Sequence, residues 1–445
     1  MTFARFRLSA FATAAVLSAA VLPAQQPPPP AGSLVYGNGS IFALHDGVVF
    51  RLDAVSLRVL ASVDLRNVQA TAGVAAAAPA ATETKTVGEV AEPLAEPSAP
   101  KRRAVEGAVD NALKWLAEHQ DGDGKWDADQ FMKHDTVGPA CDGAGNPTKD
   151  IGVTALATLA FLGHGSTLRV GPHAEQVKGA VAWLRDQQQD NGLIGMPVAH
   201  DFIYSHCIAT FALSEAYGLS GEKLLGPVVQ NAINYLESHR NPYSVWRYQP
   251  RDNDNDTSVT TWALMAYESA KSFDLKVNEQ ALGLVGVWYD QVSDPTGRHG
   301  YTKAGERSSR HPGDHAVVFP PEQGEAMTAA GLYGRFLLGQ TPKSKPIMKS
   351  AAALLAARPP RWRDDAIDPY YWWFGTAAMF QMGGREWRIW ESGLKDVVDA
   401  QRREGNCAGS WDPVGVWDMD GGRVYATAMH TLTLEVDLRA ARIVR

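Results

Sequence analysis

The sequence predicts that most of the chain folds as a closed ring of helical hairpins, an (α/α)6 toroid. From residue 104 to 445, an amphipathic helix and a buried helix alternate six times. A turn motif with the skeleton Trp-Leu, Gln, Gly and Trp recurs in part in "ALKWLAEHQDGDGKW", "AVAWLRDQQQDNGLIG" and "VVDAQRREGNCAGSW". The last buried helix, "VYATAMHTLTLEV", is apolar, whereas an open solenoid ends in a polar cap. The repeat and its apolar end together favour ring closure.

The composition is that of a globular protein without a large basic surface. The chain has 445 residues, 45% of them hydrophobic, and a formal net charge of −7. This length accommodates one large repeat domain plus accessory segments. No nucleic-acid partner is expected, because proteins that bind nucleic acid carry a basic field.

Residues 1–24 have the pattern of a secretory signal peptide. Arg5 and Arg7 precede the apolar stretch "LSAFATAAVLSAAVL", and the small residue Ala24 offers a cleavage point. The stretch is short for a membrane span, and no other segment is long and apolar enough for one, so no stable span is expected after cleavage. We therefore expect export to the periplasm or the extracellular space, with an uncleaved anchor as the alternative.

Three accessory segments separate the signal from the ring. Residues 25–32, "QQPPPPAG", predict an extended tether. Residues 33–66 contain short β-rich runs between the turn signals "GNG", "HDG" and "DAVS", which predicts a small β module. Residues 67–103 are rich in Ala, Pro, Glu and Thr and poor in large apolar residues, so a disordered linker is expected there.

Within the predicted toroid, 104–445, amphipathic helices are expected to face water and apolar helices to lie inside. Residues 104–118 place apolar side chains at helical spacing with charged ones between them, which predicts an outer helix. Residues 150–163, "DIGVTALATLAFLG", are apolar on nearly all sides, which predicts an inner helix. A Thr near the start of each inner helix aligns the repeats, namely Thr154, Thr210, Thr260, Thr328, Thr376 and Thr427.

The chain has three cysteines, and export permits a disulfide between two of them. Cys141 and Cys407 lie in loops of the first and last repeats, which become neighbours if the ring closes. A Cys141–Cys407 bridge that fastens the closure is therefore expected. Cys207 lies in the apolar helix "SHCIATFAL" and is expected to be a buried small side chain.

The strings "YSHCIATFALSEAYG", "DTSVTTWALMAYESAK" and "GRVYATAMHTLTLEV", together with the Gln/Trp turns, carry a family resemblance. From about residue 104 the chain resembles the α/α-toroid of terpenoid cyclases and protein prenyltransferases. More narrowly, it is similar to exported bacterial proteins with prenyltransferase and squalene-oxidase repeats. In the cyclases the Gln/Trp motifs are structural, and the resemblance implies the same role here.

The string "RDNDNDTS", residues 251–258, is the one that most suggests chemistry. Squalene-hopene-type cyclases, which the chain resembles, carry Asp-x-Asp-Asp-Thr, whose middle Asp protonates an alkene. Alignment on Asp256 and Thr257 places Asn255 at that middle position, and an amide cannot donate the proton. Asp256 and Asp254 remain candidate acids. The structural alternative is a solvated loop that ends with Asp256 as a helix N-cap.

No metal site and no cofactor is expected. The protein prenyltransferases need Asp, Cys and His ligands for zinc, and the chain has no Asp-x-Cys string. The same residues 251–258 lack the Gly and Glu of a calcium loop. His299, His311, Asp314 and His315 form a loose group in a polar insertion, which is typical of a surface loop.

Side chains at the starts of the inner helices are expected to share one rim of a central cavity, where helix N-termini favour anions. Glu325 is a further candidate catalytic residue, because carbohydrate-active (α/α)6 enzymes use carboxylates beside aromatic platforms. The predicted rim comprises Asp150, His206, Asp256, Trp262, Glu325, Tyr371, Trp372 and Tyr425.

The favoured function is that of an exported ring without an intact cyclase acid motif or zinc site, which binds a ligand or a partner. The partner is an unknown apolar small molecule or a protein. Two enzyme classes remain as alternatives: a divergent terpenoid- or squalene-cyclase-type enzyme and a carbohydrate-active (α/α)6 enzyme. The cavity lining discriminates among them, since a dry aromatic cavity suits a terpenoid, a polar groove suits a sugar and a plugged cavity suits a scaffold.

Overall fold

The computed structural model divides into two units, Thr2–Val90 and Ala91–Arg445, which are taken separately. The predicted signal peptide and tether, and the linker before residue 99, lie outside the described residues. The structure describes residues 34–37, 40–45, 48–53 and 59–64, and residues 99–443 except 309 and 312.

The strands of the first unit form an antiparallel sheet in the order β1-β2-β3-β4. Each strand pairs with the next along the chain, and a register shift lies between Arg51 and Leu52. The strands fall within the β-rich stretch, whose limits at 33 and 66 stay a prediction. Their bounds are Leu34–Gly37 (β1), Ser40–His45 (β2), Val48–Asp53 (β3) and Val59–Asp64 (β4).

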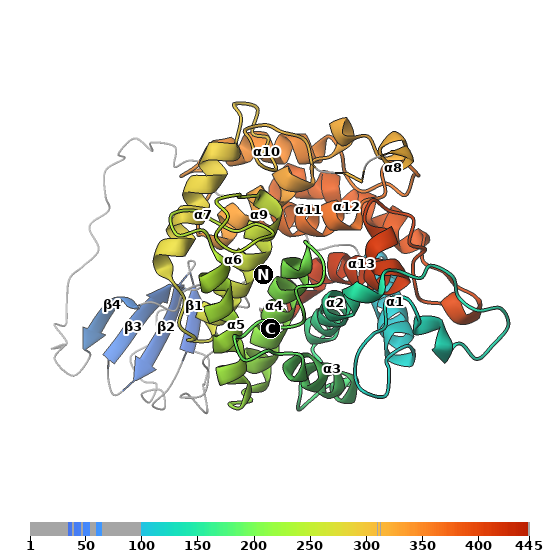
Figure 1. Ribbon diagram of the computed structural model, residues 1–445. Coiled ribbons are helices and arrows are strands. Elements are labelled where there is room, and N and C mark those ends of the chain that lie inside the picture. Colours follow the sequence, from blue (N-terminus) through green and yellow to red (C-terminus); the bar gives the residue numbers. More distant parts are fainter. Residues whose placement is uncertain are drawn as a thin grey trace. The chain divides into compact units, whose positions relative to one another are not determined.

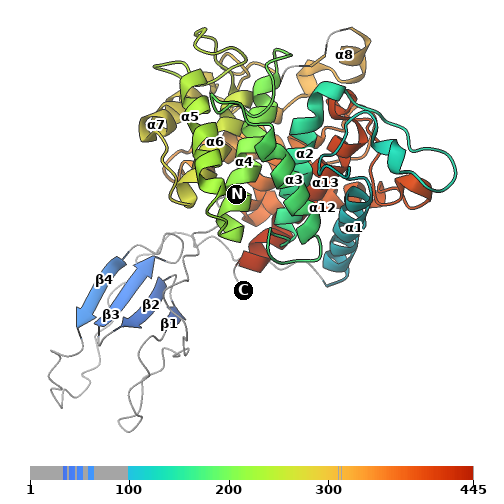
Figure 2. The same cartoon turned by 60° about the horizontal axis from the view of Figure 1, so that its bottom comes forward.

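The second unit is a closed ring of inner helices. Each inner helix packs against the next in chain order, and the last packs against the first (Figure 1). Figure 2 shows α2, α4 and α6 side by side and upright. The inner helices are Asp150–Gly163 (α2), Phe202–Ser220 (α4), Thr257–Ser272 (α6), Ala326–Leu337 (α9), Pro369–Met382 (α11) and Asp418–Ile443 (α13).

Outer helices cover this ring, and the short helix α8 lies in the insertion between α7 and α9. The first outer helix begins inside the predicted linker, which therefore ends earlier than residue 103. No helix among the described residues is long and apolar enough to cross a membrane. The bounds are Ala99–Glu118 (α1), Ala174–Asp186 (α3), Leu225–His239 (α5), Glu279–Val292 (α7), Asp314–Val318 (α8), Ile347–Ala356 (α10) and Gly384–Asp399 (α12).

Burial explains the two kinds of helix. Helix α3 buries Val177, Ala180, Val181 and Leu184, which recur at helical spacing on one face. The inner helix α2 is buried continuously from Gly152 onward, because it contacts both its ring neighbours and the outer layer. A helix that is apolar on all sides is therefore stable only in the inner ring, because only there is its whole surface removed from water.

Where the turn motif contains its Gln, this side chain joins one hairpin to the next. The amide of Gln120 donates to the carbonyls of Gly124 at 2.8 Å and Gln176 at 2.9 Å. Gln188 makes the same pair of bonds to the carbonyls of Gly192 and Val228. The last such side chain, Gln401, donates to Gly409 at 2.9 Å and to Ala108 of α1 at 2.7 Å. The repeat that links neighbours thus also links the final hairpin to the first.

The Trp of the motif fastens the turn to its own hairpin. The indole of Trp126 donates to the Leu116 carbonyl at 2.7 Å, and that of Trp411 donates to the Val397 carbonyl at 2.7 Å. The aligned Thr accepts from the Trp backbone, at 2.9 Å from Trp126 N to Thr154 Oγ1. These bonds satisfy buried polar groups that would otherwise destabilise the fold. The structural role implied by the resemblance agrees with them.

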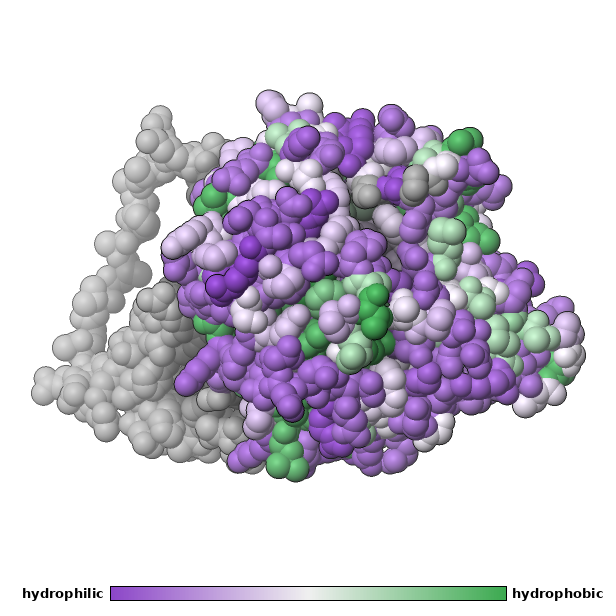
Figure 3. Space-filling model, in the orientation of Figure 1, coloured by the Kyte–Doolittle hydropathy of each residue, from purple (hydrophilic) through white to green (hydrophobic). Residues whose placement is uncertain are grey.

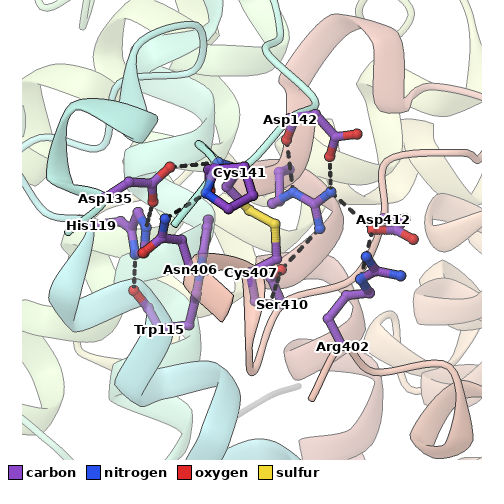
Figure 4. The surroundings of a disulfide bond; sticks show 12 residues. Trp115, His119, Asp135, Cys141, Asp142, Arg402, Asn406, Cys407, Ser410 and Asp412 are labelled. Atoms are coloured by element: carbon purple, nitrogen blue, oxygen red, sulfur yellow. Dashed lines mark hydrogen bonds and ion pairs between the residues drawn. A yellow bond between two sulfur atoms is a disulfide. The ribbon is translucent and has the colours of Figure 1, made fainter. Parts of the chain in front are cut away.

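The predicted Cys141–Cys407 disulfide is present and joins the first and last loops of the ring (Figure 4). The Cα atoms lie 5.5 Å apart, across a sequence separation of 266. Beside it, Asn406 donates to the carbonyls of Val137 at 2.6 Å and Pro139 at 2.9 Å. The backbone carbonyl oxygen of Asn406 accepts from the indole of Trp115 at 2.8 Å.

A second contact closes the ring on the inner side. Arg423 at the start of α13 is buried and donates to the Asp142 carbonyl at 2.8 Å and to Asp412 at 2.9 Å. Gly422 has a φ of 66° and lies so near Gly145 N that an added Cβ would approach it to 2.5 Å. Only glycine fits this close approach. Ring closure is therefore built from backbone geometry, ion pairs and a covalent bridge together.

Candidate functional site: the central cavity

A cavity of about 450 Å³ lies at the starts of the inner helices. Its wall is made by first- and second-turn side chains that lie four residues apart on one helix face. On α4 these are Tyr204 and Ile208, and on α6 they are Ser258 and Trp262. The other inner helices contribute Gly152, Leu156, Ala326, Met327, Tyr370, Gly421 and Tyr425.

The cavity changes from polar to apolar with depth. Polar and charged side chains lie before the inner helices or in their first turn, whereas Leu156, Ile208 and Trp262 lie one turn further in. On the face of the molecule that Figure 3 shows, hydrophobic side chains gather near the place where Figure 1 labels α2 and α4. Met196 and Val198 of the connection between α3 and α4 are 57% and 68% exposed. The polar members of the wall include Lys149, His200, Asp201, Ser308, Arg310, His311 and Asp420.

Lys149, Arg310 and His311 on this wall each contact a carboxyl group. Lys149 forms an ion pair with Asp201, and His311 Nε2 lies 3.0 Å from Asp420 Oδ2. Arg310 lies 3.3 Å from the buried carboxylate of Asp368. Paired charges attract a further ion weakly, because each already has a counter-charge in contact. The mouth of the cavity is thus polar without a strong preference for an anion.

A chain of hydroxyl groups runs along one side of the cavity. Tyr204 OH donates to Ser258 Oγ at 2.7 Å, and Ser258 Oγ lies 2.8 Å from Tyr370 OH. Tyr248 OH and Tyr301 OH form a second hydrogen bond. Burial raises the pKa of these tyrosines above the usual value, so their hydroxyl groups stay protonated.

Asp256 is a buried carboxyl group behind this chain. It caps α6, and its Oδ1 accepts from Val259 N at 2.7 Å. Tyr301 OH donates to Oδ2 at 3.4 Å, and Arg247 Nε lies 3.6 Å from the same oxygen. Burial raises the pKa of Asp256 to about 7, despite the hydrogen bond to Val259 N and the charge of Arg247. This carboxyl group can therefore hold a proton near neutral pH.

Asn255, which the resemblance places at the proton-donating position, lies in a loop. Its side-chain oxygen accepts from Val245 N at 3.1 Å and from Asn241 Nδ2 at 3.1 Å. The candidate acid Asp254 is exposed and lies 3.4 Å from Arg247. These residues organise the loop before α6 and do not line the cavity.

Of the predicted rim, the structure brings Trp262 and Tyr425 to the cavity wall. Asp256 lies behind the wall, where its carboxyl group accepts a hydrogen bond from the wall residue Tyr301. The remaining candidates make structural contacts elsewhere. Asp150 pairs with Lys125 at 2.6 Å, outside the lining residues.

The other four rim candidates are enclosed by partners from the ring. His206 Nδ1 accepts from Ile194 N at 3.0 Å, and burial lowers the pKa of His206 to about 3. Glu325 is buried against Arg298 and Arg307, at 2.8 and 2.7 Å. The structure also holds Tyr371 through its hydroxyl to the Arg358 carbonyl at 2.9 Å, and packs Trp372 against Trp362 and His430.

Asp127, Asp129 and Asp150 place one carboxylate oxygen each within 4.8 Å of one another. Lys125 lies 3.3 Å from Asp127 and 2.6 Å from Asp150, and Lys133 lies 3.2 Å from Asp127. The ammonium groups thus pair with Asp127 and Asp150, whereas burial and the hydrogen bond to Asp127 raise the pKa of Asp129. In the polar insertion, His311 reaches the cavity, whereas His299 is buried and accepts from Arg335 at 2.8 Å.

The predicted rim contains few of the residues that line the cavity, although the aligned Thr residues indicate which helix face points inward. The residue two positions before the aligned Thr lines the cavity in α2, α4, α6, α9 and α13. The Thr side chains face away from the axis toward the turns or their own helix. The inward face therefore lies about 160° from the Thr, as a helix of 100° per residue requires. The wall positions found in this way are Gly152, Ile208, Ser258, Ala326 and Tyr425.

Comparisons with known proteins support the fold. No family model matches the chain, and no curated protein matches it. The chain is similar in structure to cellobiose 2-epimerase from Bacillus thermoamylovorans B4167, with 12% identity, a TM-score of 0.54, and coverage of 76% of this chain and 99% of that one. A sugar epimerase from a ruminal bacterium gives 11% identity, a TM-score of 0.53, and coverage of 76% and 98%. The type II terpene cyclase MstE from Scytonema gives 14% identity, a TM-score of 0.48, and coverage of 78% and 100%.

At these identities the similarity concerns the fold. The two epimerases support a helical toroid for this chain. Function must be argued from the cavity itself, since one fold serves many reactions.

Proposed function

We propose that the chain is a ligand-binding toroid whose central cavity takes an apolar small molecule with a polar end. The observation that carries the proposal is the change from a polar mouth to an apolar floor. The volume of about 450 Å³ falls in the range of small-molecule sites. A plugged scaffold does not have such a cavity.

The physical chemistry of the wall favours this ligand class. Burial of an apolar surface against Leu156, Ile208 and Met327 stabilises the complex by about 25 cal/mol per Å². Hydroxyl groups at the mouth can bind a polar end without removing a net charge from water. The ion pairs of Lys149 with Asp201 and of Arg310 with Asp368 argue against a strongly anionic end.

The proposal includes the class of the ring. We assign it to the (α/α)6 toroids with prenyltransferase and squalene-oxidase repeats. The support is the recurrence of the Gln hydrogen bonds at Gln120, Gln188 and Gln401, and the closed order of the inner helices.

The test is calorimetric titration of the purified chain with geraniol and farnesol, and with glucose and cellobiose in parallel. The isoprenoid alcohols are expected to bind and the sugars are not. Ile208→Trp fills the floor and should abolish binding. Leu219→Trp, the same substitution type at an exposed site of the same helix, should leave binding unchanged. Binding of sugars alone would favour the carbohydrate-active alternative instead.

An acid-catalysed isomerase or lyase of the terpenoid-cyclase type is the second candidate. The observation that favours it is the buried carboxyl of Asp256, which connects through Tyr301 and Tyr248 to the cavity wall. Incubation with geranylgeraniol or squalene and mass-spectrometric analysis of products tests it. A cyclised product that Asp256→Asn abolishes supports this candidate, and unchanged substrate excludes it for the compounds used.

We further propose that the chain works outside the cytoplasm, as residues 1–24 predict. A disulfide is stable in an oxidising compartment, and the Cys141–Cys407 bridge fits that setting. Fusion of residues 1–24 to an alkaline phosphatase that lacks its own signal should give phosphatase activity. An inactive, cytoplasmic fusion would contradict the proposal.

A further inference from the structure

Two hydroxyl groups on the cavity wall form a chain that ends on the buried carboxyl group of Asp256. Tyr248 and Tyr301 both line the cavity, and their hydroxyl groups are hydrogen-bonded to each other. Tyr301 OH also donates to Asp256 Oδ2 at 3.4 Å. Tyr248 is therefore the end of the chain that lies away from the carboxyl group, and the direction of the hydrogen bonds decides what Tyr248 offers to a ligand.

An ionised Asp256 sets the direction of both hydrogen bonds, because a carboxylate only accepts and a phenol has one proton. Tyr301 gives its proton to Asp256, so it can only accept from Tyr248. Tyr248 thus uses its own proton within the chain and has only lone pairs left for the cavity. The neighbouring hydroxyl group of Tyr204 likewise donates to Ser258 Oγ at 2.7 Å. This side of the cavity therefore presents hydrogen-bond acceptors.

The two oxygens of the carboxyl group have different partners. Oδ1 of Asp256 accepts from Val259 N at 2.7 Å at the start of α6. A proton on Asp256 therefore lies on Oδ2, from which it can be donated to Tyr301. The order of the chain then reverses, and Tyr248 can donate its proton into the cavity. Protonation of one buried group thus changes the end of the chain from an acceptor into a donor.

Asp256 is a group that titrates near neutral pH, because burial raises its pKa to about 7. Burial also raises the pKa of the phenols and of the thiol around it, so these groups keep their protons in this range. The exposed His200 is a further titratable neighbour, with its ring centroid 4.9 Å from that of Tyr248. The other ionisable groups that face this part of the wall are Arg247 with its partner Asp254, Tyr204, Cys207, Tyr301 and Tyr370.

Arg247 disfavours a cationic ligand end at this place. Its guanidinium carbon lies 5.2 Å from the ring centroid of Tyr248 and 5.5 Å from that of Tyr301. Its Nε lies 3.6 Å from Asp256 Oδ2, so the carboxylate already has a counter-charge. An ammonium group beside Tyr248 would be repelled by the guanidinium group. An alcohol supplies a proton for Tyr248 without a charge.

We propose that the ligand of the central cavity is an apolar alcohol whose hydroxyl group donates a hydrogen bond to Tyr248. Tyr301 and Asp256 act as positioning residues, because they direct the proton of Tyr248 away from the ligand. This inference rests on the proposed function, in which an apolar molecule with a polar end occupies the cavity. It adds the chemical class of the polar end and the residue that selects it.

The test compares geranylacetone with the secondary alcohol obtained by reducing its carbonyl group, so that both compounds have one carbon skeleton. Equilibrium dialysis against the full chain gives the dissociation constants at about pH 8.5 and about pH 5.5, on either side of the pKa of Asp256. At the higher pH the alcohol is expected to bind roughly fivefold to tenfold more tightly, because the ketone has no proton for Tyr248. Equal affinities at this pH would overturn the proposal.

At the lower pH the advantage of the alcohol should shrink. A protonated Asp256 lets Tyr248 donate, and the oxygen of either compound accepts that hydrogen bond. An advantage that is the same at both pH values would contradict the role of Asp256 in ordering the chain.

The variant Asp256→Asn should remove the preference at both pH values. Its side-chain oxygen keeps the bond from Val259 N, so its amide nitrogen faces Tyr301 and donates to it. The chain then points permanently toward the cavity. An alcohol preference that survives in this variant contradicts the ordering. A pH dependence that survives would assign the titration to His200 and would also contradict it.

The variant Tyr248→Phe removes the acceptor and keeps the ring. At about pH 8.5 it should weaken binding of the alcohol roughly fivefold to tenfold and leave the ketone unchanged. Tyr371→Phe is the matched control, because the hydroxyl group of Tyr371 donates to the Arg358 carbonyl away from the lining residues. Equal weakening of both compounds by Tyr248→Phe contradicts the selective role of its hydroxyl group.

The two proposals fail in different ways. If neither compound binds to the wild type, and geraniol and farnesol do not bind either, the proposed function itself fails. If the alcohol and the ketone bind with equal affinity at about pH 8.5, the cavity still takes an apolar ligand, and only the assignment of an alcohol to Tyr248 fails.

Discussion

Replacement of both bridging cysteines should destabilise the toroid by an amount set by the length of chain that the bridge encloses. In Cys141→Ser/Cys407→Ser the folded ring keeps its other closing contacts, through Asn406, Arg423 and Gln401. The loss therefore falls on the unfolded chain, which gains freedom when the loop opens.

The magnitude follows from the separation of 266 residues between the two cysteines. The chain-entropy relation gives a loss of about 5–6 kcal/mol at 25 °C for a loop of this length. This is comparable with the whole stability of many domains, so the unbridged ring should unfold at a much lower denaturant concentration.

The assay is guanidinium unfolding followed by tryptophan fluorescence, with and without a reductant. Reduced wild type and the double Ser variant should share one midpoint, well below that of the oxidised wild type. The reductant should not alter the double variant, whose remaining Cys207 is buried and unbridged. Equal midpoints for oxidised and reduced wild type would refute the reasoning, because they would show that loop closure contributes nothing.

Two further predictions concern the turns and the buried acid. Gln401→Ala removes two buried hydrogen bonds at the closure and should cost about 1–3 kcal/mol in the same assay, whereas the exposed control Gln189→Ala should cost less than about 0.5 kcal/mol. Equal losses would mean that the amide does not fasten the ring. The pKa of Asp256 rises from 3.8 to about 7 on folding, so its contribution to stability is complete below about pH 4 and is lost as the pH rises through about 7. Asp256→Asn keeps the N-cap and should flatten the fall in urea midpoint between about pH 5 and pH 8, and an unchanged slope would argue against burial as the cause.

The sequence does not predict most of the side chains that line the cavity. The sequence predicts Tyr371 on the rim, but its neighbour Tyr370 lines the cavity. One residue on a helix is a rotation of about 100°, which separates the inward from the lateral face. The choice between them requires the orientation of α11, which the packing of α9 and α13 determines.

The sequence also does not predict which partners the buried or partly buried ionisable side chains have. Glu325 is enclosed by Arg298 and Arg307, and both arginines come from the segment between α7 and α9. His311 comes from the same insertion and reaches the cavity wall beside Asp420 of α13. Partners so distant along the chain leave no local pattern.

The sequence by itself determined the helical ring and its closure. Amphipathic and apolar helices alternate, the Gln/Trp turns recur, and Cys141 and Cys407 lie at the two ends of the repeat. These features are local or periodic, so they can be read without coordinates. The tertiary structure alone decided which side of each inner helix faces the axis, and thereby which side chains, such as Ile208 and Tyr425, line the cavity. The physical reason is that a helix apolar on all sides carries no preferred direction, and only packing against its neighbours gives it one.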